Sequence, residues 1–199
     1  MKKIFSLAAV FVLLICSASA ERNFLSFSFG LSSGIPFYGT EESNNYAKEL
    51  DSSSRFVIGT YALLNLNIVK TASVYSGAEL ISDFKWQNPY YTNHLHCDFP
   101  LGIRLSPGLA GFSFGTAYLL GFRGDFYKVE VIDENEDTSK VEKMNTATAW
   151  GNGFKFFLEY DFSYHGSQML PTAGLSWTFM PRGNNEYDNL LQIYFGLNL

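Results

Sequence analysis

The chain has 199 residues, of which 47% are hydrophobic, 17% aromatic and only 17% charged, and its formal net charge is −5. This composition excludes a disordered chain, which needs few aromatic residues and much charge. The negative charge and the lack of a basic run exclude a nucleic-acid-binding surface. Beyond residues 1–20, no apolar run approaches the ~20 residues that a membrane-spanning helix needs.

Residues 1–20 have the pattern of an export signal. Lys2 and Lys3 precede an apolar core, and Ala18-Ser-Ala20 matches the small-x-small pattern of a cleavage site. We therefore expect a cleaved signal peptide over 1–20 and a single domain over 21–199. A lipoprotein modified at Cys16 is the alternative, but the preceding Ile15 is not the small residue that such a site normally has.

Eight segments after the signal alternate with period two between apolar residues and others, a pattern typical of β-strands. The apolar face has no charged residue in any segment, whereas the other faces together carry ten charged residues and eleven of the 17 glycines. A β-bulge is expected at Pro100 and at Pro171, because proline removes a hydrogen bond from the ladder. The predicted strands cover residues 24–32, 55–68, 74–86, 94–106, 111–123, 149–162, 168–180 and 191–199.

The two faces have the opposite arrangement to that of a soluble sheet protein, in which the apolar face packs against a second layer. A membrane barrel accounts for both faces, because lipid covers the apolar one and the lumen holds the polar one. The sequence therefore predicts an all-β, eight-stranded antiparallel transmembrane barrel with an interior filled by side chains. The odd-numbered connections are longer than the even-numbered ones. Extracellular loops are the long ones in such barrels, so both termini are expected in the periplasm.

Acidic and basic side chains are balanced on the inward face. We expect a network centred on Arg104, because an arginine can reach across so narrow a lumen and pair with carboxylates on other strands. The alternative is that these charges line a water-filled lumen. The residues of the expected network are Arg104, Glu79, Glu159, Asp161, Lys155 and Arg123.

The last strand carries an uninterrupted outward apolar row. Its members are Leu191, Ile193, Phe195, Leu197 and Leu199. Together with the eight alternating segments, this strand resembles the small outer-membrane barrels of diderm bacteria, such as the OmpX/Ail, OmpA-barrel and OmpW families. The resemblance is one of pattern and covers the whole mature chain. It implies an outer-membrane location and recognition of the last strand by the barrel-assembly machinery, although that signal usually ends in Phe rather than Leu.

Candidate chemistry is sparse. His94, His96 and Asp98 share the inward face of one predicted strand and are weak candidates for a metal site. The simpler interpretation is that both imidazoles are hydrogen-bonded in the lumen, so no cofactor is expected. A lipid-modifying barrel enzyme would need His94 beside a partner such as Ser82 or Glu79, and no spacing is diagnostic of that.

The remaining charge lies in predicted loops over 33–54 and 124–148, which are net acidic. Acidic loops often do no more than stay solvated, but they can attract an extracellular cation or a basic host ligand. The favoured function is therefore a non-enzymatic barrel with a structural or surface-interaction role. A narrow, porin-like pore for small solutes and a lipid-modifying enzyme are the alternatives.

Overall fold

The computed structural model describes residues 24–39, 55–69, 71–107, 111–133, 138–147, 150–162, 171–182 and 187–198. Every element in these ranges longer than one turn is a β-strand. The strands are β1 (Leu25–Tyr38), β2 (Arg55–Val69), β3 (Ala72–Gln87), β4 (Tyr90–Leu105), β5 (Phe112–Asp133), β6 (Thr138–Ala147), β7 (Gly151–Asp161), β8 (Pro171–Pro181) and β9 (Tyr187–Asn198). No helix in the described part of the chain is long and apolar enough to cross a membrane. The predicted signal peptide lies outside the described residues.

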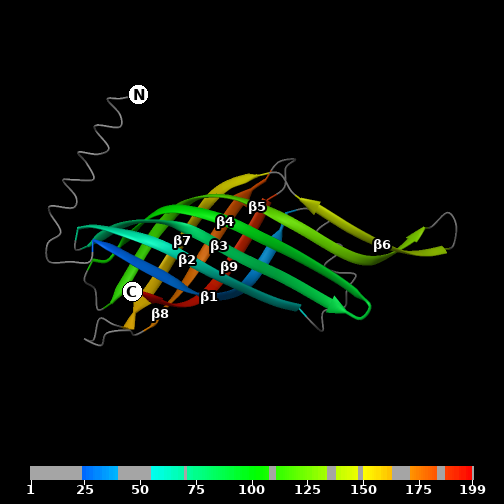
Figure 1. Cartoon of the computed structure of the whole chain (residues 1–199), viewed down its shortest axis with the longest axis horizontal. Coiled ribbons are helices and arrows are strands. Elements are labelled where there is room, and N and C mark those ends of the chain that lie inside the picture. The colour runs from blue at the N-terminus through cyan, green and yellow to red at the C-terminus, as the bar shows by residue number, and fades with distance from the viewer. Residues whose placement is uncertain are drawn as a thin grey trace, which may run out of the picture.

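Eight of these strands close into an antiparallel barrel. The sheet order is β4-β3-β2-β1-β9-β8-β7-β5, and β4 pairs with β5 to complete the cylinder (Figure 1). The first strand meets the last through an unbroken register from Ser28↔Asn198 to Tyr38↔Asp188. The predicted fold class is confirmed.

The ninth strand, β6, was not predicted. Strand β5 pairs with β7 from Phe112 to Gly121, and from Gly124 onward it pairs with β6 instead. The upper part of β5 and β6 thus form a hairpin that projects from the barrel at the end opposite Asn198 (Figure 1). We call this the projecting hairpin, its end of the barrel the loop end, and the other end the terminus end.

Strand boundaries at the loop end differ most from those predicted. Strand β1 continues to Tyr38, and β3 and β4 are joined by residues 88–89 alone. The expected alternation of long and short connections is therefore wrong for this hairpin. The barrel extends at the loop end because its strands are longer than predicted, and not because a long loop joins β3 to β4.

The two prolines do not produce the expected bulges. The β3–β4 register is the same on both sides of Pro100, at Ser76↔Leu101 and Glu79↔Asp98, and only the pairs between them are missing. Pro171 is the first residue of β8, where a missing N–H costs nothing inside a ladder. The register shift in these ladders lies between Asn67 and Val69 of β2.

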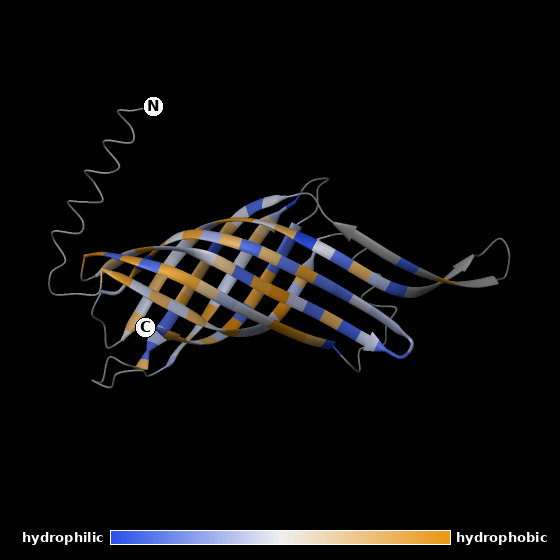
Figure 2. Cartoon of the chain, in the orientation of Figure 1, coloured by the Kyte–Doolittle hydropathy of each residue, from blue (hydrophilic) through white to orange (hydrophobic). Residues whose placement is uncertain are grey.

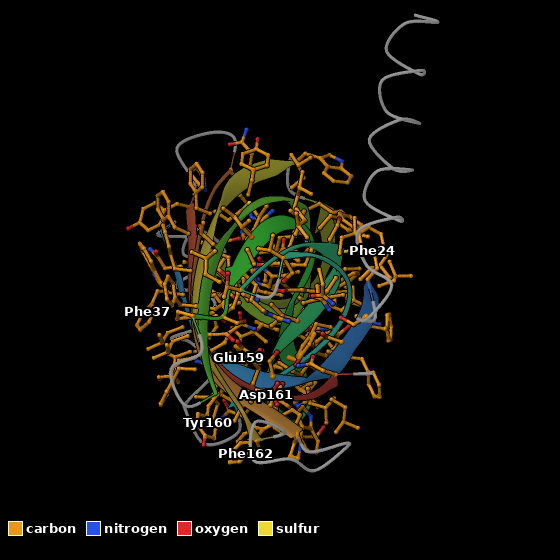
Figure 3. The ribbon with its side chains drawn as sticks, turned by 90° about the vertical axis from the view of Figure 1, so that its left-hand side faces the viewer. Phe24, Phe37, Glu159, Tyr160, Asp161 and Phe162 are labelled. Atoms are coloured by element: carbon orange, nitrogen blue, oxygen red, sulfur yellow. The ribbon has the colours of Figure 1, made fainter. Side chains whose placement is uncertain are left out.

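The predicted inward and outward phases agree with burial in all eight barrel strands. Strand β7 is the clearest case, because buried and exposed residues alternate from Gly151 to Glu159. Figure 3 shows Glu159 and Asp161 directed into the barrel and Tyr160 and Phe162 directed away from it. Large apolar side chains of all eight barrel strands are exposed on the outside. Along the ribbon, apolar and hydrophilic residues alternate, and hydrophilic ones become more frequent toward the projecting hairpin (Figure 2).

Inward glycines leave room for large side chains. Gly30 and Gly196 face each other across β1 and β9, and a Cβ on Gly196 would lie 1.9 Å from the Tyr61 hydroxyl oxygen. A Cβ on Gly174 would lie 2.4 Å from the ring of Tyr194. Tyrosine rings therefore fill the lumen beside these glycines and pack directly against their backbone.

The outward face gives the first prediction. Leu101 lies in the outward apolar row of β4 and is 59% exposed, so Leu101→Arg should lower the free energy of unfolding from lipid bilayers by about 2–4 kcal/mol. Asn93→Arg is the matched control on the same strand and face, at a site that is already polar, and should cost only about 0–1 kcal/mol. Denaturant titration of vesicle-inserted protein measures both, and equal costs would contradict a lipid-facing Leu101.

Candidate functional site

The barrel interior holds two groups of charged side chains at different heights. The terminus-end cluster consists of Arg104, Glu159, Lys155 and Glu79. The loop-end cluster is larger and joins Tyr38, Arg55, Asp83, His94, His96, Arg123, Asp125, Arg182 and Asp188.

The terminus-end cluster contains two ion pairs that cross the lumen. Lys155 Nζ on β7 donates to both carboxylate oxygens of Glu79 on β3, at 2.6 and 2.8 Å. Arg104 Nη2 on β4 lies 3.5 Å from Glu159 Oε2 on β7, and Arg104 Nη1 donates to Asn65 Oδ1 on β2 at 3.3 Å. These contacts connect strands that are not neighbours in the sheet.

Aromatic rings surround the two cations of this cluster. The Arg104 guanidinium carbon lies 5.8 Å from the centre of the Tyr75 ring and 5.6 Å from that of Phe157. Lys155 Nζ lies 6.0 Å from the ring of Tyr194. The space left between these side chains is about 20 Å³, which is room for little more than one water molecule.

The loop-end cluster begins at the rim with a bidentate ion pair. Arg55 donates through Nε and Nη2 to the two oxygens of Asp83, both at 2.8 Å. Tyr38 Oη donates to the same carboxylate at 2.9 Å and lies 3.2 Å from His96 Nε2. Because the Tyr38 proton is committed to Asp83, the neutral His96 ring is assigned as the Nε2–H tautomer, donating to the Tyr38 oxygen.

Deeper in the cluster, two arginines share one carboxylate. Arg123 forms a bidentate pair with Asp125 at 2.8 and 3.0 Å, and its Nη1 donates to Asp188 Oδ1. Arg182 Nε donates to the other oxygen of Asp188. Arg123 is 1% exposed, so this group is held away from water with its charges matched.

The two histidines are hydrogen-bonded to other side chains of the cluster. His94 Nδ1 lies 2.7 Å from Asp125 Oδ1, and His96 Nδ1 accepts from Arg182 Nη2 at 3.4 Å. Asp98 faces the lumen one step further along β4, and its Oδ1, like His94 Nε2, has no hydrogen-bond partner among the described residues. Within the same part of the chain, no group of three His, Cys, Asp or Glu side chains is placed to hold a metal ion.

The residues expected around Arg104 are thus divided between the clusters. Glu159 contacts Arg104, Glu79 is bound by Lys155 instead, and Arg123 belongs to the loop-end cluster. Asp161 lies inward at the end of β7, where its backbone N–H donates to Gly111 O at 2.9 Å.

Sequence reasoning missed four members of the loop-end cluster. Tyr38, Asp125, Arg182 and Asp188 lie beyond the predicted strand ends and were counted as loop residues, yet each is at most 6% exposed. A signal existed for Asp125, because alternation continues past Arg123 through Phe126. The net negative charge on the outer loops is smaller by one than the sequence suggested, since Asp125, Asp188 and Arg182 all lie inside.

Two further predicted sites are placed by the fold. Leu191, Ile193 and Phe195 of the expected assembly signal point outward and are each at least 50% exposed. Leu199 lies outside the described residues. Ser82, considered as a partner of His94, points outward and donates to Asn93 Oδ1 at 2.7 Å, so it does not reach the histidine.

Comparison with known proteins places the fold. No family model matches the sequence, and no curated protein matches it. The structure is similar to Ail, the attachment invasion locus protein of Yersinia pestis, with a TM-score of 0.55 at 7% identity, covering 88% of this chain and 97% of Ail. Neisserial surface protein A gives 0.46 at 6% identity, covering 88% and 97%. The N-terminal β-barrel domain of Pseudomonas aeruginosa OprF gives 0.39 at 11%, covering 88% and 98%. The likeness to Ail shows a common fold, that of a small eight-stranded outer-membrane barrel.

The second prediction concerns the Lys155–Glu79 pair. Lys155→Met leaves a carboxylate unpaired at a site where Glu79 is 5% exposed, and should cost about 3–5 kcal/mol of unfolding free energy. Adding Glu79→Gln removes the stranded charge and should recover most of that loss. Denaturant unfolding of the single and double variants tests this, and equal stability of the two would mean that water already solvates Glu79.

Proposed function

We propose that this chain is a non-enzymatic outer-membrane barrel whose lumen is closed and whose working surface is the loop end. The observation that carries the proposal is the contrast between the two ends of β5. From Phe112 to Gly121 β5 pairs with β7 in the barrel wall, whereas from Gly124 onward it pairs with β6 instead. Its ladder with β4 ends at Lys128, and beyond that residue β5 and β6 form the projecting hairpin alone. A hairpin that extends beyond the membrane is placed to bind a partner outside the cell.

Two features argue against the pore alternative. An eight-stranded barrel encloses a space just wide enough for side chains, and here two clusters of paired charges occupy it at different heights. The space remaining beside the terminus-end cluster is about 20 Å³. A porin-like path for small solutes would have to displace ion pairs from both clusters.

The enzyme alternative lacks a reacting group in reach. Asp125 orients His94 as an acid orients a catalytic histidine, but His94 is only 2% exposed. No hydroxyl or thiol of the described residues contacts its free nitrogen. A lipid substrate at the outer surface would have no access to this imidazole.

The expected partners follow from these surfaces. Outer-membrane lipid would cover the outward apolar rows, and the barrel-assembly machinery would read the row of β9, with both termini in the periplasm. The acidic segments over 33–54 and 124–148 would receive a cation or a basic host ligand.

The third prediction tests closure of the lumen. In planar bilayers the wild-type barrel should be silent, and Arg104→Ala alone should stay silent because the loop-end cluster still fills the lumen. Arg104→Ala combined with Arg123→Ala should produce measurable ion conductance, since the terminus-end cluster and the loop-end cluster then each lose a central arginine. Steady channels from the wild type would instead favour the pore. Flotation with lipid vesicles confirms that each variant is inserted.

The fourth prediction tests the projecting hairpin as a charged binding surface. Replacing residues 129–142 by an Asn-Gly turn removes six acidic residues and one lysine, and Asn-Gly closes a two-residue hairpin well. The shortened barrel should still insert, but its nanodiscs should bind immobilised polylysine more weakly than wild type at low salt. High salt should abolish the difference, because it screens exposed charges. Unchanged binding would remove the hairpin from the proposed surface.

The fifth prediction tests the assembly signal. Ending the chain at Leu190 removes the outward row of β9 and also strips β1 of the partner with which it pairs from Ser28 to Ile35. An open strand edge cannot sit in lipid, so the truncated chain should fail to insert. Phe195→Ser in the full chain leaves the β1–β9 pairing intact, so this variant should still insert, but more slowly than wild type. Surface display of the truncated chain at wild-type level would contradict the proposal.

A further inference from the structure

The outer wall of the barrel carries an apolar groove in addition to the filled lumen. A groove of about 320 Å³ lies over β7, β8 and β9, against about 20 Å³ between the charged side chains of the lumen. It lies at the terminus end, because Ala173 follows the start of β8 and Phe195 precedes the end of β9.

The groove exists because one outward position is small. Across the sheet, Ala173 pairs with Tyr160 on β7 and with Phe195 on β9. Directly opposed residues have Cβ atoms about 4.5–5.5 Å apart, so the methyl group of Ala173 forms a floor between two aromatic walls. On the far side of Tyr160, Phe112 packs edge-on against it with ring centres 4.9 Å apart, which fixes that wall.

The next row of the sheet closes one end of the groove with aliphatic side chains. Leu175 pairs with Leu158 and with Ile193, and all three are about half exposed, at 53%, 48% and 50%. Glu159 and Tyr194 border the groove from behind, but they are 3% and 7% exposed and belong to the lumen. The surface that a ligand meets is therefore hydrocarbon and aromatic ring.

We propose that this groove is a binding site for one acyl chain of a phospholipid. The proposal rests on the membrane insertion put forward above, because the groove is continuous with the outward apolar rows that lipid would cover. Water is a poor occupant, since an apolar cavity offers it no hydrogen-bond partners. A flexible hydrocarbon chain can lie on Ala173 between the rings of Tyr160 and Phe195, and each methylene group that it buries there is favourable.

Filling the floor is the direct test. The barrel is assembled in phosphatidylethanolamine vesicles, extracted in a mild detergent and examined by native mass spectrometry for retained phospholipid. Ala173→Phe should lower the retained fraction about tenfold, which corresponds to loss of contact with about two methylene groups. Ala62→Phe is the matched control, because Ala62 is an outward alanine of β2, and it should retain lipid as wild type does.

Each other outcome overturns the proposal in a recognisable way. Equal retention by all three proteins would mean ordinary annular lipid, and no retention by wild type would mean that the groove has no specific occupant. A wild-type dimer that Ala173→Phe dissolves would mean that a second copy covers the groove. Flotation of the same samples separates these results from failure of membrane insertion itself. Ala173→Leu replaces the phenylalanine variant if the latter does not fold.

Discussion

Closure of the hydrogen-bonded ladder is the constraint on which the rest of this molecule depends. Once β4 pairs with β5 and β1 with β9, the barrel wall has no open strand edge. This is the condition for strands to cross a bilayer. Closure also directs the inner side chains of eight strands into one narrow space. Most charges placed there are paired with another side chain of the lumen, because water has little room to solvate them.

The two clusters satisfy that condition in different ways. At the terminus end, Lys155 and Arg104 each reach a carboxylate on a distant strand while aromatic rings pack around them. At the loop end, Asp188 is shared between Arg123 and Arg182, so neighbouring pairs depend on one another. Removing one partner strands the other, which makes the interior a source of rigidity as well as a barrier. Side chains on the outer wall need no such partners, and a single small residue there, Ala173, leaves the groove over β8.

The alternation of residues was sufficient to predict the barrel and the inward or outward direction of each side chain in it. It did not predict where strands end at the loop end, because a strand that rises out of the membrane no longer needs an apolar outer face. Lys128, for example, follows Phe126 on the outward phase of β5 and breaks the pattern. Asp125 and Asp188 were therefore counted as loop charges. Which acid meets which base also escaped prediction, because partners such as Glu79 and Lys155 are joined by the circumference of the barrel rather than by sequence spacing.

The exchange of partners along β5 has a consequence for the depth at which the molecule sits. Above Gly124 the sheet is no longer closed, since β6 pairs with β5 alone among the described strands. An open edge must lie in water, so the hydrocarbon slab has to end near that residue. The outward Ser82–Asn93 hydrogen bond on β3 and β4 marks a similar height. From Phe112 to Phe122, ten steps of about 3.4 Å tilted by about 40° rise roughly 26 Å. That matches the apolar band of about 25 Å expected for such barrels, so the length of β5 below Gly124 corresponds to the thickness of the hydrocarbon layer that the barrel would span.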